Sequence, residues 1–435
     1  MARLYNHLTS DLAYCAVSKC LEHKWRRNDV QTYIEEWTGY SRKELYADEI
    51  AHKGLSVGMK YNIICELACA AEDMVDGIMH GIDPDLDPVS VREKPDGATG
   101  KIRRIAYLCM RHQVLGHLVK LGIEPLLNAR LLPTQHASIP GKGQTGLARQ
   151  VKRMLNRKLG IKMYVKTDCT SAYASVMYSL CIDLIKKEIP RAKWILACLR
   201  VLERYAPDGH LIIGGYLDAW LFNFVMSYAL RYVLSLSKSR RDNKYPLVIR
   251  AGTFMDDMVL MGRSETALRQ AVKSLTDWLQ RKFHMTMRTT TAIIRLYTVE
   301  EEKEHKRRTR PAARGCPSID MGGFRIHRSH ITIRRRNVKR ILRCFTRAWT
   351  ELQATGTIKR QRAMQIISRN GMVSSTDAYR LCHKYHVHEI LKVAKRVQAY
   401  WLRVADRNRK ERLNNAVDQH RIHREALCCS TGAAG

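Results

Sequence analysis

The chain has 435 residues, and its 75 Lys and Arg against 41 Asp and Glu give a formal net charge of +34. At roughly 100–200 residues per domain, this length excludes a single small module and predicts two to four packed units. Because 45% of the residues are hydrophobic, the composition also excludes a fully disordered chain. A folded protein with this charge is expected to meet a polyanion, either nucleic acid or an acidic membrane surface, with lysine-rich solubility as the alternative.

Cysteine usage and hydropathy point to a reduced, membrane-free environment. The 13 cysteines are odd in number and loosely spaced, which is typical of an intracellular chain rather than a disulfide framework. The chain begins with mixed polar residues after Met1, so it lacks the pattern of an export signal. Its most apolar stretch, residues 217–236, contains Asp218, Asn223 and Arg231, which favours a buried helix over a membrane span. We expect a cytoplasmic protein with no membrane partner.

Residues 1–90 are predicted to form an N-terminal helical region. Apolar residues recur there at three- and four-residue intervals, as in Ile63, Leu67, Ala70 and Met74. Pro, Asp and Gly then crowd together between residues 83 and 97, which predicts a loop or hairpin tip and a boundary near residue 90. This region carries no motif of its own, which leaves a structured RNA or an accessory protein as its candidate partner.

A first candidate for chemistry is Asp168. The apolar segment from Tyr164 to Thr167 ends at this acid, and Tyr173 lies five positions later. We predict a strand that presents the Asp168 carboxylate at its end. The structural alternative is an N-cap role for Asp168 at a helix that begins near residue 171.

A second candidate is the pair Asp256 and Asp257, which lies between two short apolar runs within residues 253–261. This pattern predicts a strand, a tight turn and a second strand, although adjacent Asp residues also occur on ordinary surface turns. Acids from two neighbouring strands can hold Mg²⁺, a hard cation that prefers oxygen ligands. Two such ions, roughly 3.5–4 Å apart, clamp the attacking and leaving oxygens of a phosphoryl displacement.

Together, these two segments resemble motifs A and C of the reverse transcriptase palm. Phe254-Met255-Asp256-Asp257 matches the motif C pattern of an aromatic, any residue and two aspartates, and Asp168 with Tyr173 matches motif A. The resemblance implies that Asp168 and Asp256, supported by Asp257, are the catalytic residues and the ligands of two Mg²⁺ ions, with Mn²⁺ as an alternative ion. It also implies that Tyr173 is a steric gate against the ribose 2′-hydroxyl and favours deoxynucleotides.

Two basic segments precede motif A. Lys101, Arg103 and Arg104 resemble the fingers segment that holds the incoming triphosphate, and their cations suit phosphate oxygens. Gly141-Lys142-Gly143, which precedes a basic helix with Arg149, resembles a Gly-basic-Gly segment of prokaryotic reverse transcriptases. The resemblance implies that Lys142 and Arg149 contact template or nucleotide phosphates. The segment is not a P-loop, because it lacks the Gly-Lys-Ser/Thr ending.

Ile213 and Gly214 occupy the place of motif B and are expected at the nucleotide. Retroviral and group II intron reverse transcriptases have Gln-Gly there, followed three residues later by Ser-Pro, whereas this chain has Ile213 in place of Gln. Reverse transcriptases of diversity-generating retroelements are similar in having an aliphatic residue before the Gly, although Asp218 and Ala219 match neither version. Without the Gln, the pocket has one hydrogen-bonding group fewer near the template and the nucleotide, which puts ordinary copying fidelity in question.

The segment after motif C resembles a primer grip followed by a thumb. Residues 318–325 match motif E, with Gly322 and Gly323 permitting a sharp turn, and motif D offers only Arg288. A strand from Ile331 then leads into a basic helix. Its cations recur at three- and four-residue steps, and a positive face of this kind suits the backbone of an A-form hybrid. The residues expected to contact nucleic acid here are Arg334, Arg335, Arg336, Lys339 and Arg340.

The resemblance covers about residues 95–400 and implies an α+β right-hand polymerase. Residues 1–90 would be the N-terminal helical region, 91–330 the fingers and palm, and 331–435 the helical thumb and tail. The leading hypothesis is an RNA-directed DNA polymerase that copies an RNA template into cDNA from dNTPs, within a diversity-generating or similar prokaryotic or phage retroelement. The alternatives are an antiphage-defence enzyme that makes untemplated or protein-primed DNA, and a non-catalytic RNA-binding scaffold.

Overall fold

The computed structural model describes residues 7–95, 100, 102–157, 159–170, 172–288, 292–308, 315–405 and 407. The chain divides into two compact units, which we call unit 1 and unit 2. Unit 1 contains residues 1–20 and 71–334, and unit 2 contains residues 21–70 and 335–435. Both combine segments that are distant in sequence. The predicted domain limits near residues 90 and 330 stay a prediction.

The N-terminal region is helical, as predicted. Its helices are α1 (Ser10–Leu21), α2 (Asn28–Trp37), α3 (Arg42–His52) and α4 (Val57–Met79). Helix α3 begins with a capping box, in which Ser41 accepts from the backbone N–H of Glu44 while the Glu44 carboxylate accepts from the backbone N–H of Ser41. This reciprocal pair satisfies two backbone donors that a helix start otherwise leaves unpaired.

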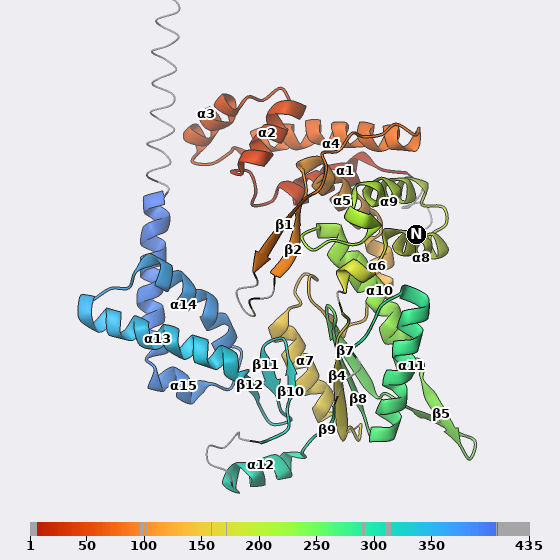
Figure 1. Cartoon of the computed structure of the whole chain (residues 1–435). Helices are drawn as coiled ribbons and strands as arrows, with labels where there is room; N and C mark the ends of the chain where they lie inside the picture. Colours follow the sequence, from red (N-terminus) through yellow and green to blue (C-terminus); the bar gives the residue numbers. More distant parts are fainter. Residues whose placement is uncertain are drawn as a thin grey trace, which may run out of the picture. The chain divides into compact units, whose positions relative to one another are not determined.

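Unit 1 contains a five-stranded sheet with the order β3-β7-β8-β4-β9 (Figure 1). The strands are β3 (Gln135–His136), β4 (Met163–Thr167), β7 (Arg250–Phe254), β8 (Asp257–Gly262) and β9 (Ile293–Arg295). All pairs are antiparallel except β3 with β7. The interior strand β8 is buried from Met258 onward, because α11 (Glu265–Phe283) packs against it. Helices α7 (Gln144–Asn156) and α10 (Tyr216–Ser235) also pack against the sheet.

A second group of helices in unit 1 packs around α10. It contains α5 (Met110–Gly122), α6 (Glu124–Arg130), α8 (Tyr178–Glu188) and α9 (Lys193–Tyr205). Most of α10 is buried, including Phe222 and Phe224, which agrees with the predicted buried helix. Within the described residues, no helix is both long enough and apolar enough to span a bilayer.

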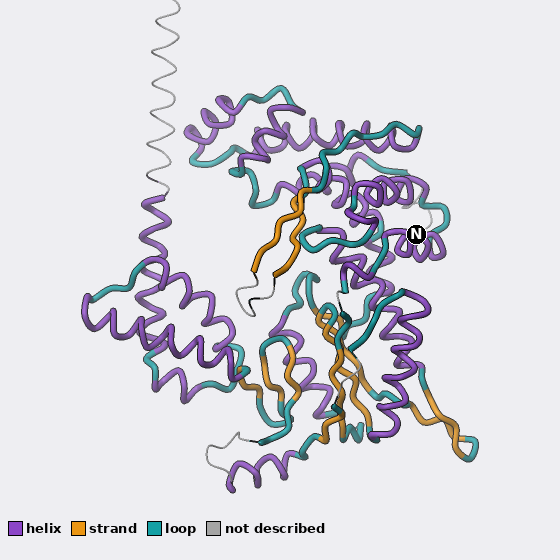
Figure 2. The backbone as a smooth tube through the Cα atoms, viewed as in Figure 1, coloured by secondary structure: helices purple, strands orange, loops and turns teal. Residues whose placement is uncertain are grey.

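Smaller strands and helices complete unit 1. Strands β1 (Ser90–Pro95) and β2 (Ile102–Tyr107) form an antiparallel ribbon that is largely exposed (Figure 2). Strands β5 (Ser237–Arg240) and β6 (Asn243–Pro246) form another hairpin. Strands β10 (Ile319–Met321), β11 (Phe324–Ile326) and β12 (Ile331–Ile333) form a three-stranded sheet. The turn between β10 and β11 is Gly322-Gly323, both with positive φ, as the sequence predicts. Helix α12 spans Val299–Arg308.

The C-terminal part of unit 2 consists of α13 (Arg335–Thr355), α14 (Arg360–Val373), α15 (Tyr379–Lys384) and a helix over 387–405. Helix α13 buries Ile341, Cys344, Phe345 and Ala348, a spacing that places them on one face. It packs with α14. The strand-to-basic-helix pattern after residue 331 is therefore confirmed.

Gly122 provides a test of the packing between α5 and α9. A Cβ at this position would lie 2.7 Å from Cη2 of Trp194 and 2.9 Å from Cδ1 of Ile195. Gly122→Ala should therefore lower the free energy of unfolding by about 1–3 kcal/mol through overpacking, measured by urea denaturation. Gly58→Ala is the matched control, because a Cβ there meets nothing within 4 Å. An equal, small effect of both substitutions would contradict the tight packing.

Candidate active site

The hairpin of β7 and β8 carries the paired aspartates. Phe254 pairs with Asp257, so Met255 and Asp256 form the turn between them. Met255 has a φ of 54°, the left-handed conformation that such a tight turn requires. The predicted strand, turn and strand are confirmed, and Asp256 lies at the tip of the hairpin.

Asp168 lies beside this hairpin because β4 pairs with β8. Thr167, the last residue of β4, pairs with Met258, so the residue that follows it, Asp168, comes level with Asp257. The N-cap alternative for Asp168 is wrong, since the following helices begin only at Tyr173 and Tyr178. The backbone carbonyl of Asp168 instead accepts a hydrogen bond from the N–H of Arg288, at 3.1 Å.

The three carboxylates are close enough to influence one another. Burial raises the pKa of Asp256, and the negative charges of Asp257 and Asp168 raise it further. The guanidinium of Arg103 acts in the opposite direction, which places this β2 residue within electrostatic reach of the turn. Burial, with Asp256 and Asp168 as lesser causes, also raises the pKa of the Cys169 thiol to about 12.

Two cations partly neutralise this cluster. Lys166 Nζ lies 3.0 Å from Asp257 Oδ1, and Arg288 Nε lies 3.3 Å from Asp168 Oδ2. Sequence reasoning left Lys166 unassigned, because its pairing with Asp257 follows from the register between β4 and β8. From the sequence, Arg288 was named only as a candidate for motif D.

The oxygen atoms of these carboxylates are suitable ligands for a divalent cation, but the side chains do not converge on one point. Their oxygens are the ligands that Mg²⁺ prefers, and the mutual repulsion that raises the pKa of Asp256 is what a bound cation would relieve. Across the described part of the chain, however, no three His, Cys, Asp or Glu side chains converge as a metal site. Asp168 and Asp257 are paired with Arg288 and Lys166 instead.

Tyr173 lies between the aspartate turn and α10. Its hydroxyl donates to Met255 Sδ at 3.6 Å, and its ring stacks on Phe222 with centroids 4.9 Å apart and planes at 14°. Burial raises its pKa, with Asp218 and Asp256 as further causes. The structure therefore brings this predicted residue together with motif C.

The Ile213-Gly214 loop contacts the strand that carries the predicted triphosphate ligands. The backbone N–H of Ala106, on β2, donates to the carbonyl of Ile213 at 2.8 Å. Gly214 has a φ of 118°, and a Cβ there would lie 2.5 Å from the carbonyl oxygen of Ala106. Only glycine satisfies both constraints. The loop thereby fixes β2, with Arg103 and Arg104, relative to the start of α10.

Asp218, in the first turn of α10, anchors the same loop. Its Oδ1 accepts hydrogen bonds from the backbone N–H of Ile212, at 2.9 Å, and from the hydroxyl of Tyr178, at 3.0 Å. The side chain is buried, and burial raises its pKa to about 6. A Cβ on Gly215 would lie only 1.8 Å from Asp218 Oδ2. Sequence reasoning noted Asp218 as a polar residue within a buried helix and as a mismatch to motif B, but it did not identify the partners of the carboxylate.

The other residues that were predicted to contact nucleotide or nucleic acid lie outside the carboxylate cluster. Lys142 Nζ donates to the carbonyl of Pro133 at 3.5 Å, and burial lowers the pKa of this lysine. Arg149 is exposed on α7, and Arg334 forms an ion pair with Asp320. Lys101 falls outside the described residues. The remaining predicted cations lie on α13 in unit 2 and comprise Arg335, Arg336, Lys339 and Arg340.

Replacing Asp218 with Asn should change the pH dependence of stability. Because the pKa of Asp218 rises from 3.8 to about 6 on folding, its ionisation removes stability as the pH rises from about 4 to 6. Asn keeps an oxygen for Ile212 and Tyr178 but cannot ionise. We expect Asp218→Asn to gain unfolding free energy relative to wild type between pH 4 and 7, measured by urea denaturation. The exposed Asp242→Asn is the control, and identical pH profiles for all three proteins would contradict a buried charge.

Comparison with known proteins places these features in one family. The family model described as reverse transcriptase (RNA-dependent DNA polymerase) matches residues 92–317, which is more than half of the chain. The matched span includes the three aspartates, Tyr173 and the Ile213-Gly214 loop. Among curated proteins, none matches the chain. The chain belongs to the reverse transcriptase family and is an RNA-directed DNA polymerase, a nucleotidyltransferase that uses a nucleic acid template and dNTPs.

Proposed function

We propose that this enzyme synthesises cDNA on an RNA template with a right-hand polymerase architecture, in which unit 1 supplies fingers and palm and α13 begins the thumb. The observation that carries this proposal is the adjacency of Asp168 to the Asp256-Asp257 turn, imposed by the β4–β8 register. Tyr173 lies against the same turn. Acids from two strands beside an aromatic side chain are the arrangement that templated nucleotidyl transfer needs.

Asp168 and Asp256 would hold two Mg²⁺ ions, with Asp257 in support. When bound, these ions stabilise charge on the attacking and leaving oxygens of an in-line displacement. The ion pair that now occupies the Asp168 carboxylate is no obstacle. Arg288 is 62% exposed, and exposed ion pairs contribute only about 0–1 kcal/mol, so the Asp168 carboxylate is readily released for a cation.

Arg103 is the better candidate than Arg104 for the triphosphate. Successive side chains on a strand point to opposite faces, so on β2 these two arginines diverge. Arg103 is the one whose charge acts on Asp256. A guanidinium near the acids neutralises phosphate oxygens and can do so bidentately. The Ala106–Ile213 hydrogen bond holds β2 in the register that keeps Arg103 there.

The motif B loop supports a role in a diversity-generating or similar prokaryotic or phage retroelement. Ile213 contributes its backbone carbonyl to Ala106, while its aliphatic side chain offers no hydrogen bond to a template or nucleotide. A pocket without a side-chain amide discriminates less between bases, since unpaired polar groups are the strongest source of rejection. The same loop is compatible with untemplated synthesis in antiphage defence, which the template control below separates.

Asp256→Asn and Asp168→Asn should each reduce nucleotide incorporation by roughly 10²–10³-fold or more, because each removes a charge that the transition state requires. The measurement is extension of a DNA primer on a defined RNA template with radiolabelled dNTPs and Mg²⁺. Asp242→Asn, on the exposed β5–β6 turn, is the matched control. Full activity in either site variant would refute the assignment. Product that ignores the template would favour the antiphage alternative.

Tyr173→Ala should relax discrimination against ribonucleotides. Removing the ring leaves space beside Phe222 for a 2′-hydroxyl, so the ratio of kcat/KM for a dNTP to that for the matching rNTP should fall by at least about 10-fold. Tyr173→Phe keeps the ring, loses only the contact to Met255 and should retain the wild-type ratio. An unchanged ratio in Tyr173→Ala would show that the gate lies elsewhere.

A further inference from the structure

A groove in unit 2 lies between the α13–α14 turn and the helix over 387–405. Its volume is about 680 Å³, within the roughly 300–1,000 Å³ typical of ligand sites. Every residue that lines it belongs to the C-terminal part of unit 2. The charged and aromatic residues among them are Glu351, Lys359, Arg360, Arg396, Tyr400 and Trp401.

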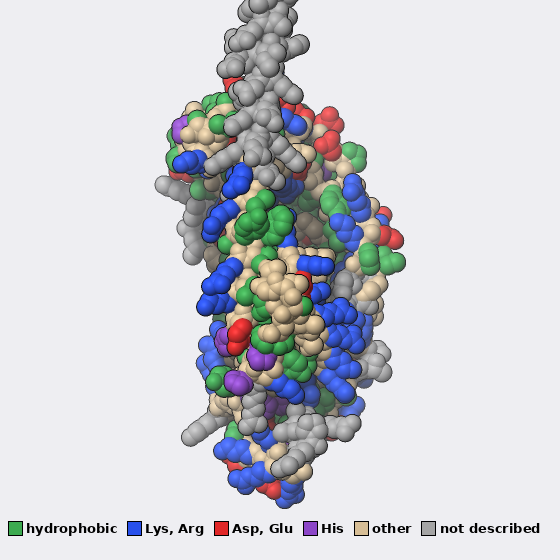
Figure 3. Space-filling view, turned by 90° about the vertical axis from the view of Figure 1, so that its left-hand side faces the viewer, with side chains coloured by type: hydrophobic (Ala, Val, Ile, Leu, Met, Phe, Trp, Pro, Cys, Tyr) green, Lys and Arg blue, Asp and Glu red, His purple; other side chains and the backbone are tan. Residues whose placement is uncertain are grey.

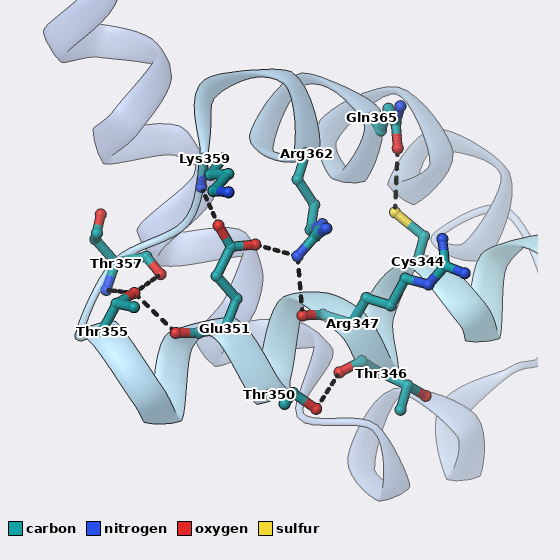
Figure 4. Close-up of polar contacts among 10 residues, drawn as sticks. All are labelled: Cys344, Thr346, Arg347, Thr350, Glu351, Thr355, Thr357, Lys359, Arg362 and Gln365. Carbon is teal, nitrogen blue, oxygen red and sulfur yellow. Dashed lines mark hydrogen bonds and ion pairs between the residues drawn. The ribbon is translucent and has the colours of Figure 1, made fainter.

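One wall of the groove is a braced turn (Figure 4). The Glu351 carboxylate accepts from the backbone N–H of Lys359 at 2.9 Å and pairs with the guanidinium of Arg362. Arg362 also donates to the carbonyl of Arg347 at 3.2 Å. Thr355 accepts from the backbone N–H of Thr357 and donates to its carbonyl. These contacts join the end of α13 to the start of α14.

The charge that the groove presents is positive. Glu351 is the one acid among the described lining residues. Its side chain is only 11% exposed and is committed to Arg362. The lining cations Lys359, Arg360 and Arg396 are all exposed. On the face of the chain that Figure 3 shows, hydrophobic side chains lie among Lys and Arg. A polyanion therefore complements this groove.

Aromatic rings lie at the edge of the same groove. Tyr400 is 61% and Trp401 37% exposed, so these rings are not core residues. They meet edge to face, with centroids 5.7 Å apart. The guanidinium of Arg360 lies 5.2 Å from the Trp401 ring centroid, a cation–π contact that fixes the indole. Exposed rings beside cations are the stacking platform that single-stranded nucleic acids use.

We propose that this groove binds unpaired RNA, with bases stacked on Tyr400 and Trp401 and phosphates against the three cations. A duplex is a poorer occupant, because its base faces are already stacked. The commitment to RNA rests on the proposed function: in RNA-templated synthesis the unpaired strand is the template not yet copied, whereas the product is paired. An acidic membrane surface offers the same complementary charge, so anionic vesicles are a comparison ligand in the test.

The test is fluorescence anisotropy of the full chain with a fluorescein-labelled, unstructured RNA 15-mer. An RNA–DNA hybrid, single-stranded DNA of the same sequence and vesicles of anionic phospholipid serve as comparison ligands. Trp401→Ala and Tyr400→Ala should each weaken RNA binding roughly 5- to 100-fold, with less than about twofold change for the hybrid. Trp401→Phe should retain most of the affinity. Trp37→Ala, on α2 and similarly exposed at 39%, is the matched control.

Arg396→Ala tests the same groove through its charge and does not depend on the folding of the aromatic variants. It should reduce the slope of log affinity against log salt for RNA by about 0.7. The proposal is overturned by unchanged RNA binding in these variants, by equal losses for RNA and hybrid, by a preference for single-stranded DNA, or by loss of vesicle binding alone. Asp256→Asn should bind RNA like wild type, so a failure of synthesis and a failure of this groove are distinguishable.

Discussion

The pairing of β4 with β8 is the constraint on which the active site depends. It brings together residues that are about ninety positions apart in the sequence, and the register alone decides that Asp168 comes level with Asp257. A slip of one residue would turn the whole face of β4 away from the hairpin. The apolar residues of both strands fix that register, because they are buried under the flanking helices. Packing in the core therefore sets the geometry of the charged groups at the sheet's end.

The loop before α10 also positions parts of the site. Gly214 lets the loop approach β2 closely, Gly215 leaves room for Asp218, and Asp218 holds the backbone of Ile212. Each of these contacts is short, so the loop tolerates little variation. The backbone of this loop is thus held from below by a buried carboxylate, that of Asp218.

Local patterns in the sequence predicted the local structure well. The Asp256-Asp257 hairpin, the Gly322-Gly323 turn and the buried helix after Gly215 are all present, because turn residues and hydrophobic periodicity act over a few positions. The resemblance to a known family identified the acids, and the family match supports it. The roles of individual site residues remain predictions.

The features that were missed all depend on distant contacts. The Lys166–Asp257 and Arg288–Asp168 pairs follow from strand register. The N-cap role considered for Asp168 was wrong, because the helix described after it begins at Tyr173 with Ala172 as its N-cap. The grouping of residues 21–70 with the C-terminal helices has no signature in local composition. Sequence spacing cannot reveal which side chains meet across a sheet or between helices.

Cys169 illustrates how the site protects its own chemistry. It directly follows Asp168, yet burial and the neighbouring acids raise the pKa of its thiol to about 12. Thiolates, not thiols, react with oxidants and alkylating agents. The buried Cys169 thiol is therefore a poorer nucleophile than a free one, so a sulfur atom can lie next to the Asp168 carboxylate with little tendency to react.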